Sequence, residues 1–338
     1  MAKTPRMHDA GFSPARRVLL LGATGTIGRA TAAALLERGH SVVCLIRPAR
    51  GDPRRGLPDG VTLRFAEVTD AASLERDGFC GESFDAVVSC LASRTGSPSD
   101  AWAVDHQAHV DVLRIARQAG VRQMILLSAI CVQRPQLAFQ HAKLAFEKVL
   151  VASGVDYSIV RPTAYFKSLS GQVARLQRGK PFLIFGDGAL TACKPISDAD
   201  LGAFLVECLD NPARRNRVLP VGGPGPAITP RQQGEELFRL MGKKPRFRSV
   251  PVGMLDGIIW VLAVLGKLFP KLGDKAELAR IGRYYATESM LVLDPRTGTY
   301  DAEATPSTGR ETLFDFYAQL LQGEASVDLG AHAVFQTS

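Results

Sequence analysis

The sequence has few of the features that build metal centres or membrane spans. Six cysteines are scattered over 338 residues, with no C-x-x-C pair and no two cysteines close together. This spacing provides no framework for an iron–sulfur cluster or a zinc site, so we predict no metal site. The longest uninterrupted apolar run covers residues 257–266. A bilayer-spanning helix needs about 20 such residues, so the sequence excludes a transmembrane protein.

The N-terminal segment also lacks an apolar leader. Its first 17 residues are polar and contain no hydrophobic stretch. We therefore expect no secretory signal peptide. Together with the scattered cysteines, this favours a reducing, cytoplasmic setting.

The composition is that of an ordinary globular protein with an uneven charge distribution. Hydrophobic residues make up 46% of the chain, charged residues 22%, and the net charge is +8. Residues 1–60 carry ten basic residues against four acidic ones. Such a segment suits a nucleic acid, an anionic membrane surface or a phosphorylated ligand, and composition alone does not choose among them.

Short apolar runs alternate with helical patterns in the first half of the chain. We predict strands at residues 18–21, 41–46, 63–66, 86–89 and 124–127, with helices at 30–38 and 101–119. Buried strands separated by helices predict an α/β fold, a Rossmann-type doubly wound parallel sheet with helices on both faces.

The regular alternation ends after Arg161-Pro162. The pattern then predicts strands at residues 181–186, 192–197 and 218–221, and helices at 229–241 and 311–321. We predict a flexible tail at 1–14, an NADP-binding domain at 15–165, a smaller substrate-binding part at 166–325 and a second tail at 326–338.

A glycine-rich run directly follows the first predicted strand and directly precedes a helix. Residues 22–28 read G-A-T-G-T-I-G. Glycines let the backbone approach a pyrophosphate, and the helix N-terminus supplies free N–H groups. The predicted cofactor-binding residues are Gly22, Thr24, Gly25, Thr26, Ile27 and Gly28.

The end of the second strand favours NADPH over NADH. An acid that bonds the adenosine ribose is usual there, whereas residues 46–48 read Ile-Arg-Pro. Arg47 would attract a 2′-phosphate that an acid would repel, with Arg29 and Arg50 nearby to assist. A solvated basic loop is the alternative interpretation. Asp70, after the third strand, is expected near the adenine.

The glycine spacing and layout resemble the short-chain dehydrogenase/reductase superfamily, with one departure. Its hallmark Tyr-x-x-x-Lys is Phe139-Gln140-His141-Ala142-Lys143 here. Lys143 still lies on the same helix face as the missing phenol and can reach the nicotinamide ribose. Ser128 keeps the usual catalytic hydroxyl. Carbonyl reduction needs a proton donor that Phe139 lacks, which leaves carbon–carbon double-bond reduction or cofactor sensing without chemistry.

Further stretches resemble one atypical branch of that superfamily, the NADPH-dependent divinyl (proto)chlorophyllide 8-vinyl reductases. They lie at residues 160–169, 179–181, 185–188, 192–197, 219–225 and 281–290. The resemblance covers roughly residues 16–330. It implies reduction of an 8-vinyl to an 8-ethyl group on a magnesium tetrapyrrole during chlorophyll or bacteriochlorophyll synthesis.

The predicted site residues fall into two further groups. The catalytic residues are expected to be Lys143, Ser128 and Tyr165. The substrate-binding residues are expected to be Phe139, Phe166, Lys167, Lys194 and Arg283. Tyr165 and Lys167 follow the sixth strand, beside the nicotinamide, as substrate contacts or proton donors. Lys194 and Arg283 are candidates for pairing with the tetrapyrrole propionate, with a structural salt bridge as the alternative.

Several residues are interpreted as structural. Cys193 is predicted to be buried, and His106, His109 and His141 to lie on helix surfaces rather than bind magnesium. Residues 257–266 are predicted to be core, with a flat apolar pocket or a peripheral membrane contact as alternatives.

Two other functions compete with vinyl reduction. One is an NADP-binding redox sensor of the same fold, which the missing tyrosine suits and the downstream motifs do not. The other is a reductase of another conjugated substrate. Because several arginines fall around the expected 2′-phosphate, nucleic acid is the least favoured partner.

Overall fold

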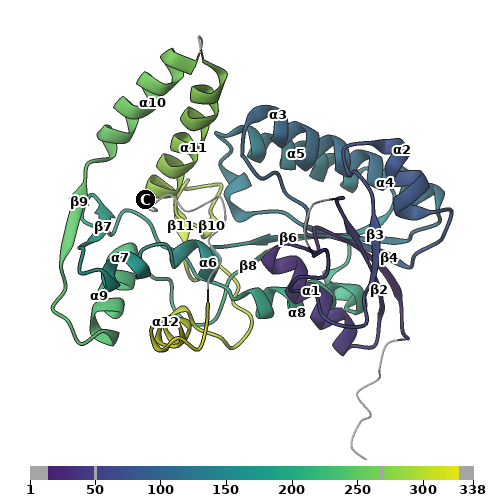
Figure 1. The fold of residues 1–338 in the computed structure, drawn as a ribbon, viewed down its shortest axis with the longest axis horizontal. Helices are drawn as coiled ribbons and strands as arrows, with labels where there is room; N and C mark the ends of the chain where they lie inside the picture. The colour runs from purple at the N-terminus through teal and green to yellow at the C-terminus, as the bar shows by residue number, and fades with distance from the viewer. Residues whose placement is uncertain (1–13, 49–51, 267–268, 327–338) are drawn as a thin grey trace, which may run out of the picture.

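A seven-stranded parallel sheet forms the main layer of the molecule (Figure 1). The computed structural model describes residues 14–48, 52–266 and 269–326. The strands follow the order β3-β2-β1-β4-β5-β6-β8, and every neighbouring pair is parallel. Their bounds are β1 Arg17–Leu21, β2 Ser41–Ile46, β3 Thr62–Phe65, β4 Ala86–Ser89, β5 Gln123–Leu127, β6 Asp156–Pro162 and β8 Arg217–Val221.

Helices cover both faces of this sheet. Helices α1 (Thr26–Glu37) and α8 (Asp198–Asp210) pack together on one face. The other face carries α2 (Ala71–Ser73), α3 (Pro98–Ala101), α4 (His109–Gln118) and α5 (Ala138–Val151), with π-helical segments at Leu74–Phe79 and Trp102–Ala108. The predicted Rossmann-type fold is confirmed.

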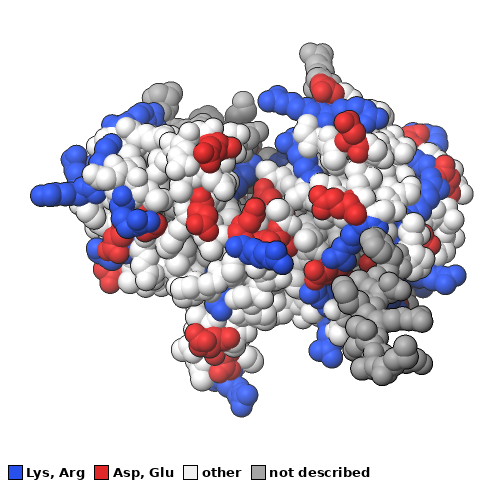
Figure 2. All heavy atoms as spheres, turned by 90° about the horizontal axis from the view of Figure 1, so that it is seen from below, with Lys and Arg blue, Asp and Glu red and all other residues white. Residues whose placement is uncertain are grey.

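Two of the arginines at the start of the chain pair with acids of the same molecule. The Arg16 guanidinium donates to Gln123 (3.0 Å) and lies 3.3 Å from the Asp210 carboxylate. Arg17 pairs with Glu82, and its guanidinium lies 5.0 Å from the centre of the Phe84 ring. Figure 2 shows acidic and basic side chains interspersed over the face seen from below. Arg16 therefore connects the start of β1 to β5 and α8, and Arg17 connects β1 to the loop before β4.

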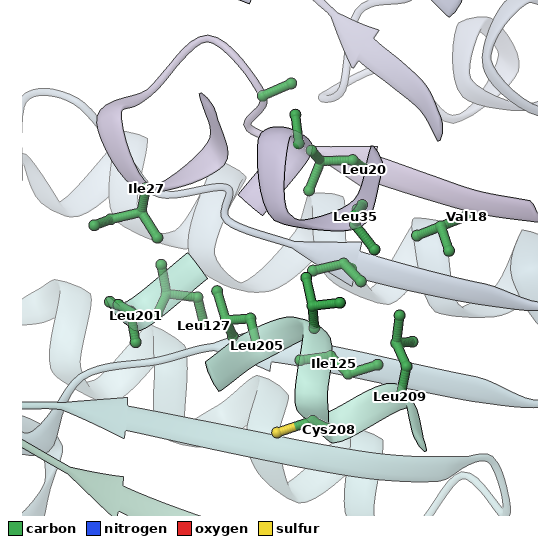
Figure 3. Packing of buried hydrophobic residues seen from close by; sticks show 14 of the residues in the cluster. Val18, Leu20, Ile27, Leu35, Ile125, Leu127, Leu201, Leu205, Cys208 and Leu209 are labelled. Atoms are coloured by element: carbon green, nitrogen blue, oxygen red, sulfur yellow. The ribbon is translucent and has the colours of Figure 1, made fainter. Parts of the chain in front are cut away.

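Side chains alternate between the two faces of the sheet and fill two separate cores. Val18 and Leu20 of β1 point to α1 and α8, where they meet Leu35 and Leu205 (Figure 3). Leu19 and Leu21 face the helices on the opposite side of the sheet. Because a strand has a side-chain period of two, continuous apolar runs such as residues 18–21 can bury both faces.

All five strands predicted in the first half are confirmed. The later half differs from the prediction in three places, of which two concern the sheet. Although α8 and β8 follow residue 166, they complete the Rossmann layer, so residues 197–221 do not belong to a separate part. The predicted strand at 192–197 is absent from the described sheets. Cys193 and Ile196 instead form isolated bridges to three different segments. Cys193 is buried, as predicted.

The remaining C-terminal elements build a third core beside the sheet. Strand β7 (Phe182–Phe185) pairs in parallel with β9 (Phe247–Val250), and a short antiparallel pair is formed by β10 (Val292–Leu293) and β11 (Tyr300–Asp301). The helices around them are α6 (Phe166–Leu169), α7 (Val173–Gln177), α9 (Pro230–Leu240) and α12 (Leu313–Gln322). Their apolar side chains form one buried cluster.

Helices α10 (Val252–Gly266) and α11 (Pro270–Thr287) form an arm that projects from this part (Figure 1). None of the fifteen residues of α10 is buried, and the Trp260 side chain is 68% exposed. The prediction that residues 257–266 are core is therefore wrong. The helix is apolar on all sides, but α11 covers only one of them. No helix within the described ranges combines the length and apolarity that crossing a bilayer requires.

Candidate cofactor and active site

The glycine-rich loop closes the crevice where the sheet reverses its strand order, between β1 and β4. Gly22 has a φ of +74°, and a Cβ placed on it would lie 2.5 Å from the Cys90 carbonyl carbon. A Cβ on Gly28 would lie 2.1 Å from the Gly22 oxygen. Neither position can hold a side chain. This is the crevice in which α/β sheets bind dinucleotides.

The N-terminus of α1 opens into the same crevice. Its N-cap, Gly25, supplies no side chain, and no acid occupies the described first turn. Thr24 and Gly25 are exposed, whereas Ile27 and Gly28 are buried beneath them. Free N–H groups and a positive helix end therefore face the crevice, as a pyrophosphate requires.

Two arginines are available for the phosphate at the adenosine end. Arg47 is exposed directly after β2. The Arg29 guanidinium lies against Gly56, and its Nε is buried without a hydrogen-bond partner in the described part of the chain. An orphaned donor beside the glycine cradle fits an anionic ligand group. Arg50 lies outside the described residues. The Asp70 carboxylate accepts from the Ala72 N–H (3.0 Å) as the N-cap of α2, and its place near the adenine stays a prediction.

Lys143 is held by a buried carboxylate that the sequence analysis missed. Its Nζ lies 2.9 Å from Asp105 Oδ1, with the two side chains 11% and 0% exposed. The Ser93 hydroxyl donates to the other Asp105 oxygen at 2.6 Å. Asp105 comes from the π-helical segment and Ser93 from the loop after β4. Three elements thus fix the ammonium in one position.

Ser128 points into a different network. Its hydroxyl donates to Glu147 Oε1 at 2.5 Å, and the Arg161 guanidinium pairs with the same carboxylate. All three residues are largely buried. Ser128 therefore joins β5 to α5 and β6, and its predicted catalytic role stays a prediction.

Two tyrosines lie in the surroundings of the Cys131 thiol, in the turn that follows β5. Burial, and then the neighbouring Cys90 and Cys131, raises the pKa of Tyr165 above its ordinary value. Burial raises the pKa of the Cys131 thiol, and the charge of Lys143 opposes this shift. The Tyr285 hydroxyl lies 3.9 Å from the Cys131 sulfur. Cys131 thus lies within electrostatic reach of both Lys143 and Tyr165, and the predicted catalytic roles of these two residues stay predictions.

Comparison with known proteins identifies the family. The model of an NAD(P)H-binding family matches residues 22–212. Rice (Oryza sativa subsp. indica) divinyl chlorophyllide a 8-vinyl-reductase, chloroplastic, is 49% identical over 331 residues, covering 94% of this chain and 82% of the relative. The Arabidopsis thaliana protein of the same name is 46% identical, with 93% and 79% covered. The chain belongs to the divinyl chlorophyllide a 8-vinyl-reductase family.

Solved structures confirm the fold of this 8-vinyl-reductase family member. The leucoanthocyanidin reductase–NADPH complex from Vitis vinifera has a TM-score of 0.66 at 16% identity, covering 90% of this chain and 99% of that one. An Escherichia coli quinone oxidoreductase complexed with NADPH has a TM-score of 0.62 at 20% identity, with 90% and 99% covered. The predicted family and the predicted nicotinamide cofactor are both confirmed.

Most of the residues predicted to bind substrate have partners within the 8-vinyl-reductase chain. Phe166 is 4% exposed and its ring centre lies 5.4 Å from that of Phe316. Lys194 is buried, and its Nζ donates to the Thr305 carbonyl at 2.9 Å. Arg283 pairs with Asp256 of α10. No described contact joins these three residues to Lys143.

The two other predicted substrate contacts, Phe139 and Lys167, lie in different surroundings. Phe139 is half-buried at the start of α5, where it packs against the third core. Lys167 acts on the Asp198 carboxylate, whose pKa is raised by burial and lowered by the Thr26 hydroxyl and Lys167. Thr26 belongs to the glycine loop. Lys167 therefore lies on the side of the crevice formed by α8.

The histidine prediction was wrong for His109, and the described residues hold no metal cluster. His109 is 1% exposed, and its Nδ1 donates to the Val104 carbonyl at 2.9 Å. Its Nε2 accepts from the Ser89 hydroxyl at 2.8 Å. Burial, followed by the charge of Lys143, lowers the pKa of His109 to about 4, so the ring is neutral. Nowhere in the described ranges do three His, Cys, Asp or Glu side chains gather as metal ligands would.

Proposed function

We propose that this chain reduces the 8-vinyl group of divinyl chlorophyllide or divinyl protochlorophyllide to an ethyl group, with NADPH as the reductant. The observation that carries this proposal is the 49% identity, over 94% of the chain, to a reductase named for that reaction. The relatives of this name match the cofactor half and the C-terminal part alike, so the similarity extends well beyond the shared nucleotide motif.

Different residues of the crevice bind different parts of the cofactor. The glycine loop and the α1 N-terminus take the pyrophosphate, because they offer N–H groups without side chains in the way. Arg29 and Arg47 take the 2′-phosphate. Lys143, positioned by Asp105, donates to the nicotinamide ribose. When bound, NADPH would supply the hydride, and these residues would hold it in the crevice.

The absence of a phenol at position 139 agrees with reduction of a carbon–carbon double bond. A carbonyl would develop a localised alkoxide that needs an acid close by. A vinyl group conjugated to a tetrapyrrole spreads the negative charge over the macrocycle, so a weaker acid suffices. Phe139 instead presents an aromatic ring that can pack against a flat substrate.

Two of the three predicted cations, Lys167 and Arg283, are partly exposed, whereas Lys194 is buried. Lys167 borders the crevice, and Arg283 stands on α11 with its side chain 37% exposed. We assign the propionate to one of these two. The Lys194 ammonium is buried and already hydrogen bonded to a backbone carbonyl, so we assign it a structural role.

Absorption spectroscopy tests the reaction directly. We expect purified protein with NADPH to shift the Soret band of divinyl chlorophyllide or divinyl protochlorophyllide to the blue, with one NADPH consumed per pigment. A protein that binds NADPH but shifts neither pigment would contradict the proposal and support the redox-sensor alternative. Parallel assays with both pigments decide which one is preferred.

We further propose that the exposed face of α10 makes a peripheral contact with a membrane surface. Its exposed residues Met254, Ile258, Trp260, Val261, Val264 and Leu265 continue into Phe269, which is 59% exposed. Part of this face lines an apolar hollow of about 480 Å³. So much exposed apolar surface on one arm is typical of an interaction site.

Vesicle binding tests the membrane contact. The chain has two tryptophans, so Trp102→Phe leaves Trp260 as the sole tryptophan reporter. Anionic vesicles should blue-shift its emission and co-sediment the protein, and Val264→Glu should abolish both effects. Leu190→Glu is the matched control, because Leu190 is a 51%-exposed apolar residue outside the arm. Equal vesicle binding by both variants would contradict the proposal.

A further inference from the structure

The reduction proposed above needs a proton as well as a hydride, and α11 brings a tyrosine to the place where the proton is required. Helix α11 lies against the carboxyl edge of the sheet. A Cβ on Gly96, in the loop after β4, would lie 2.6 Å from Ile281 Cδ1. Ile281 is one turn before Tyr285, so the same helix face meets the cofactor side of the molecule.

The neighbouring Tyr284 fixes this helix in position. Tyr284 is 2% exposed, and its hydroxyl donates between the carbonyls of Cys131 (2.8 Å) and Arg134 (3.0 Å). Glu288, one turn later, lies 3.3 Å from the Arg134 guanidinium. Tyr284 is therefore anchored to the turn that follows β5. Its hydroxyl is committed to backbone carbonyls and is not free for a substrate.

Tyr285 differs from Tyr284 in both exposure and bonding. Its side chain is 45% exposed, and its ring stands at 89° to that of Tyr284 with the centres 5.8 Å apart. Among the described residues its hydroxyl has one contact, the Cys131 sulfur at 3.9 Å. Such a weak contact leaves the O–H available to a ligand.

The surroundings of this hydroxyl keep it protonated. Desolvation of the hydroxyl, and then Cys131 and Tyr165, raises the pKa of Tyr285 well above its ordinary value. The charge of Lys143 reaches Cys131. The Tyr285 hydroxyl therefore lies at Cys131, in the turn Ile130–Gln133 that follows β5.

The other hydroxyls near the crevice are less suited to give up a proton. The Ser128 hydroxyl is committed to Glu147, and position 139 carries no hydroxyl. Tyr165 packs against the first core, and its backbone bridges to Ile196. Tyr285 is the one of these residues that combines a weakly bonded hydroxyl with a side chain that is 45% exposed.

We propose that Tyr285 is a catalytic residue that donates the proton completing reduction of the vinyl group. This inference rests on the proposed function. The step forms two C–H bonds, one with the hydride released as NADPH becomes NADP⁺ and one with the Tyr285 proton. It breaks the vinyl π bond and the tyrosine O–H bond, and water then reprotonates the phenolate.

Tyr285→Phe in the full chain tests the assignment. We expect kcat to fall about 100-fold or more, the range of general acid catalysis, with KM and the NADPH Kd little changed. The solvent deuterium isotope effect on kcat should increase, because protonation by water then limits the rate. Thermal unfolding should be unaltered, since the lost contact is a long one to sulfur.

Three further tyrosine variants complete the test. Tyr157→Phe, at the amino end of β6, should leave kcat unchanged. Tyr284→Phe should lower the unfolding temperature, because it loses the two carbonyl contacts. Tyr165→Phe examines the rival donor. A large kcat loss with a larger isotope effect in Tyr165→Phe, or full activity in Tyr285→Phe, would overturn the assignment. A wild-type chain that reduces neither pigment would overturn the proposed function itself.

Discussion

Lys143 owes its position to one buried acid. A lysine side chain is long and flexible, and holding its ammonium at a ribose costs conformational entropy. Asp105, fully buried and also bonded to Ser93, fixes that ammonium before any cofactor binds. The pair therefore combines a structural function with a positioning function for the cofactor.

Asp105→Asn should separate these two functions. The amide keeps the shape and the bond to Ser93 but leaves the Lys143 charge nearly buried without its partner. We expect a loss of about 3 kcal/mol in the free energy of unfolding, typical of a broken buried pair, and a weaker NADPH Kd. Chemical denaturation and fluorescence titration measure the two. Glu236→Gln, which breaks an exposed pair with Arg239, should cost about 0.5 kcal/mol or less. Unchanged NADPH affinity in Asp105→Asn would contradict the positioning role.

Of the two residues in this pair, the sequence predicted Lys143 and did not predict Asp105. Lys143 was predicted because a superfamily motif marks its position. Asp105 and His109 stand in a polar helical stretch with no motif around them, and both are 1% exposed. Burial of a polar residue depends on what packs over it, here α5 and β4, and a single sequence does not contain that contact.

At the scale of elements, β2 and β4 begin and end where their apolar runs predicted. Strands of a parallel sheet are buried on both faces, so their hydrophobic pattern is continuous and easily recognised. The same rule misleads for α10, which is apolar on all sides and yet is not buried. Hydrophobicity reports a tendency to leave water, and it does not specify whether protein, pigment or lipid covers the helix.

At the scale of the whole molecule, the chain crosses between its two parts several times. After α6 and β7 it returns to the sheet through α8 and β8, and it later ties the residues around Thr305 to the end of β8. Gly222 N–H donates to the Pro306 carbonyl at 2.8 Å, and Thr308 N–H donates back to Gly222 at 2.9 Å. A boundary drawn at a single residue could not represent this connectivity, because sequence order does not reveal which later strand rejoins the sheet.

Lys194 lies at this junction, and a substitution there distinguishes a structural role of its side chain from a role in substrate binding. Its ammonium donates to Thr305, so Lys194→Met leaves that buried carbonyl without a partner. We expect the free energy of unfolding to fall by about 2 kcal/mol, with both parts still melting in one transition and the KM for pigment little changed. Lys180→Met, at an exposed position, should alter stability by about 0.5 kcal/mol or less. A raised KM with unchanged stability would instead show that Lys194 binds the propionate of the substrate. The loss of a substrate contact weakens substrate binding and leaves the stability of the free protein unchanged.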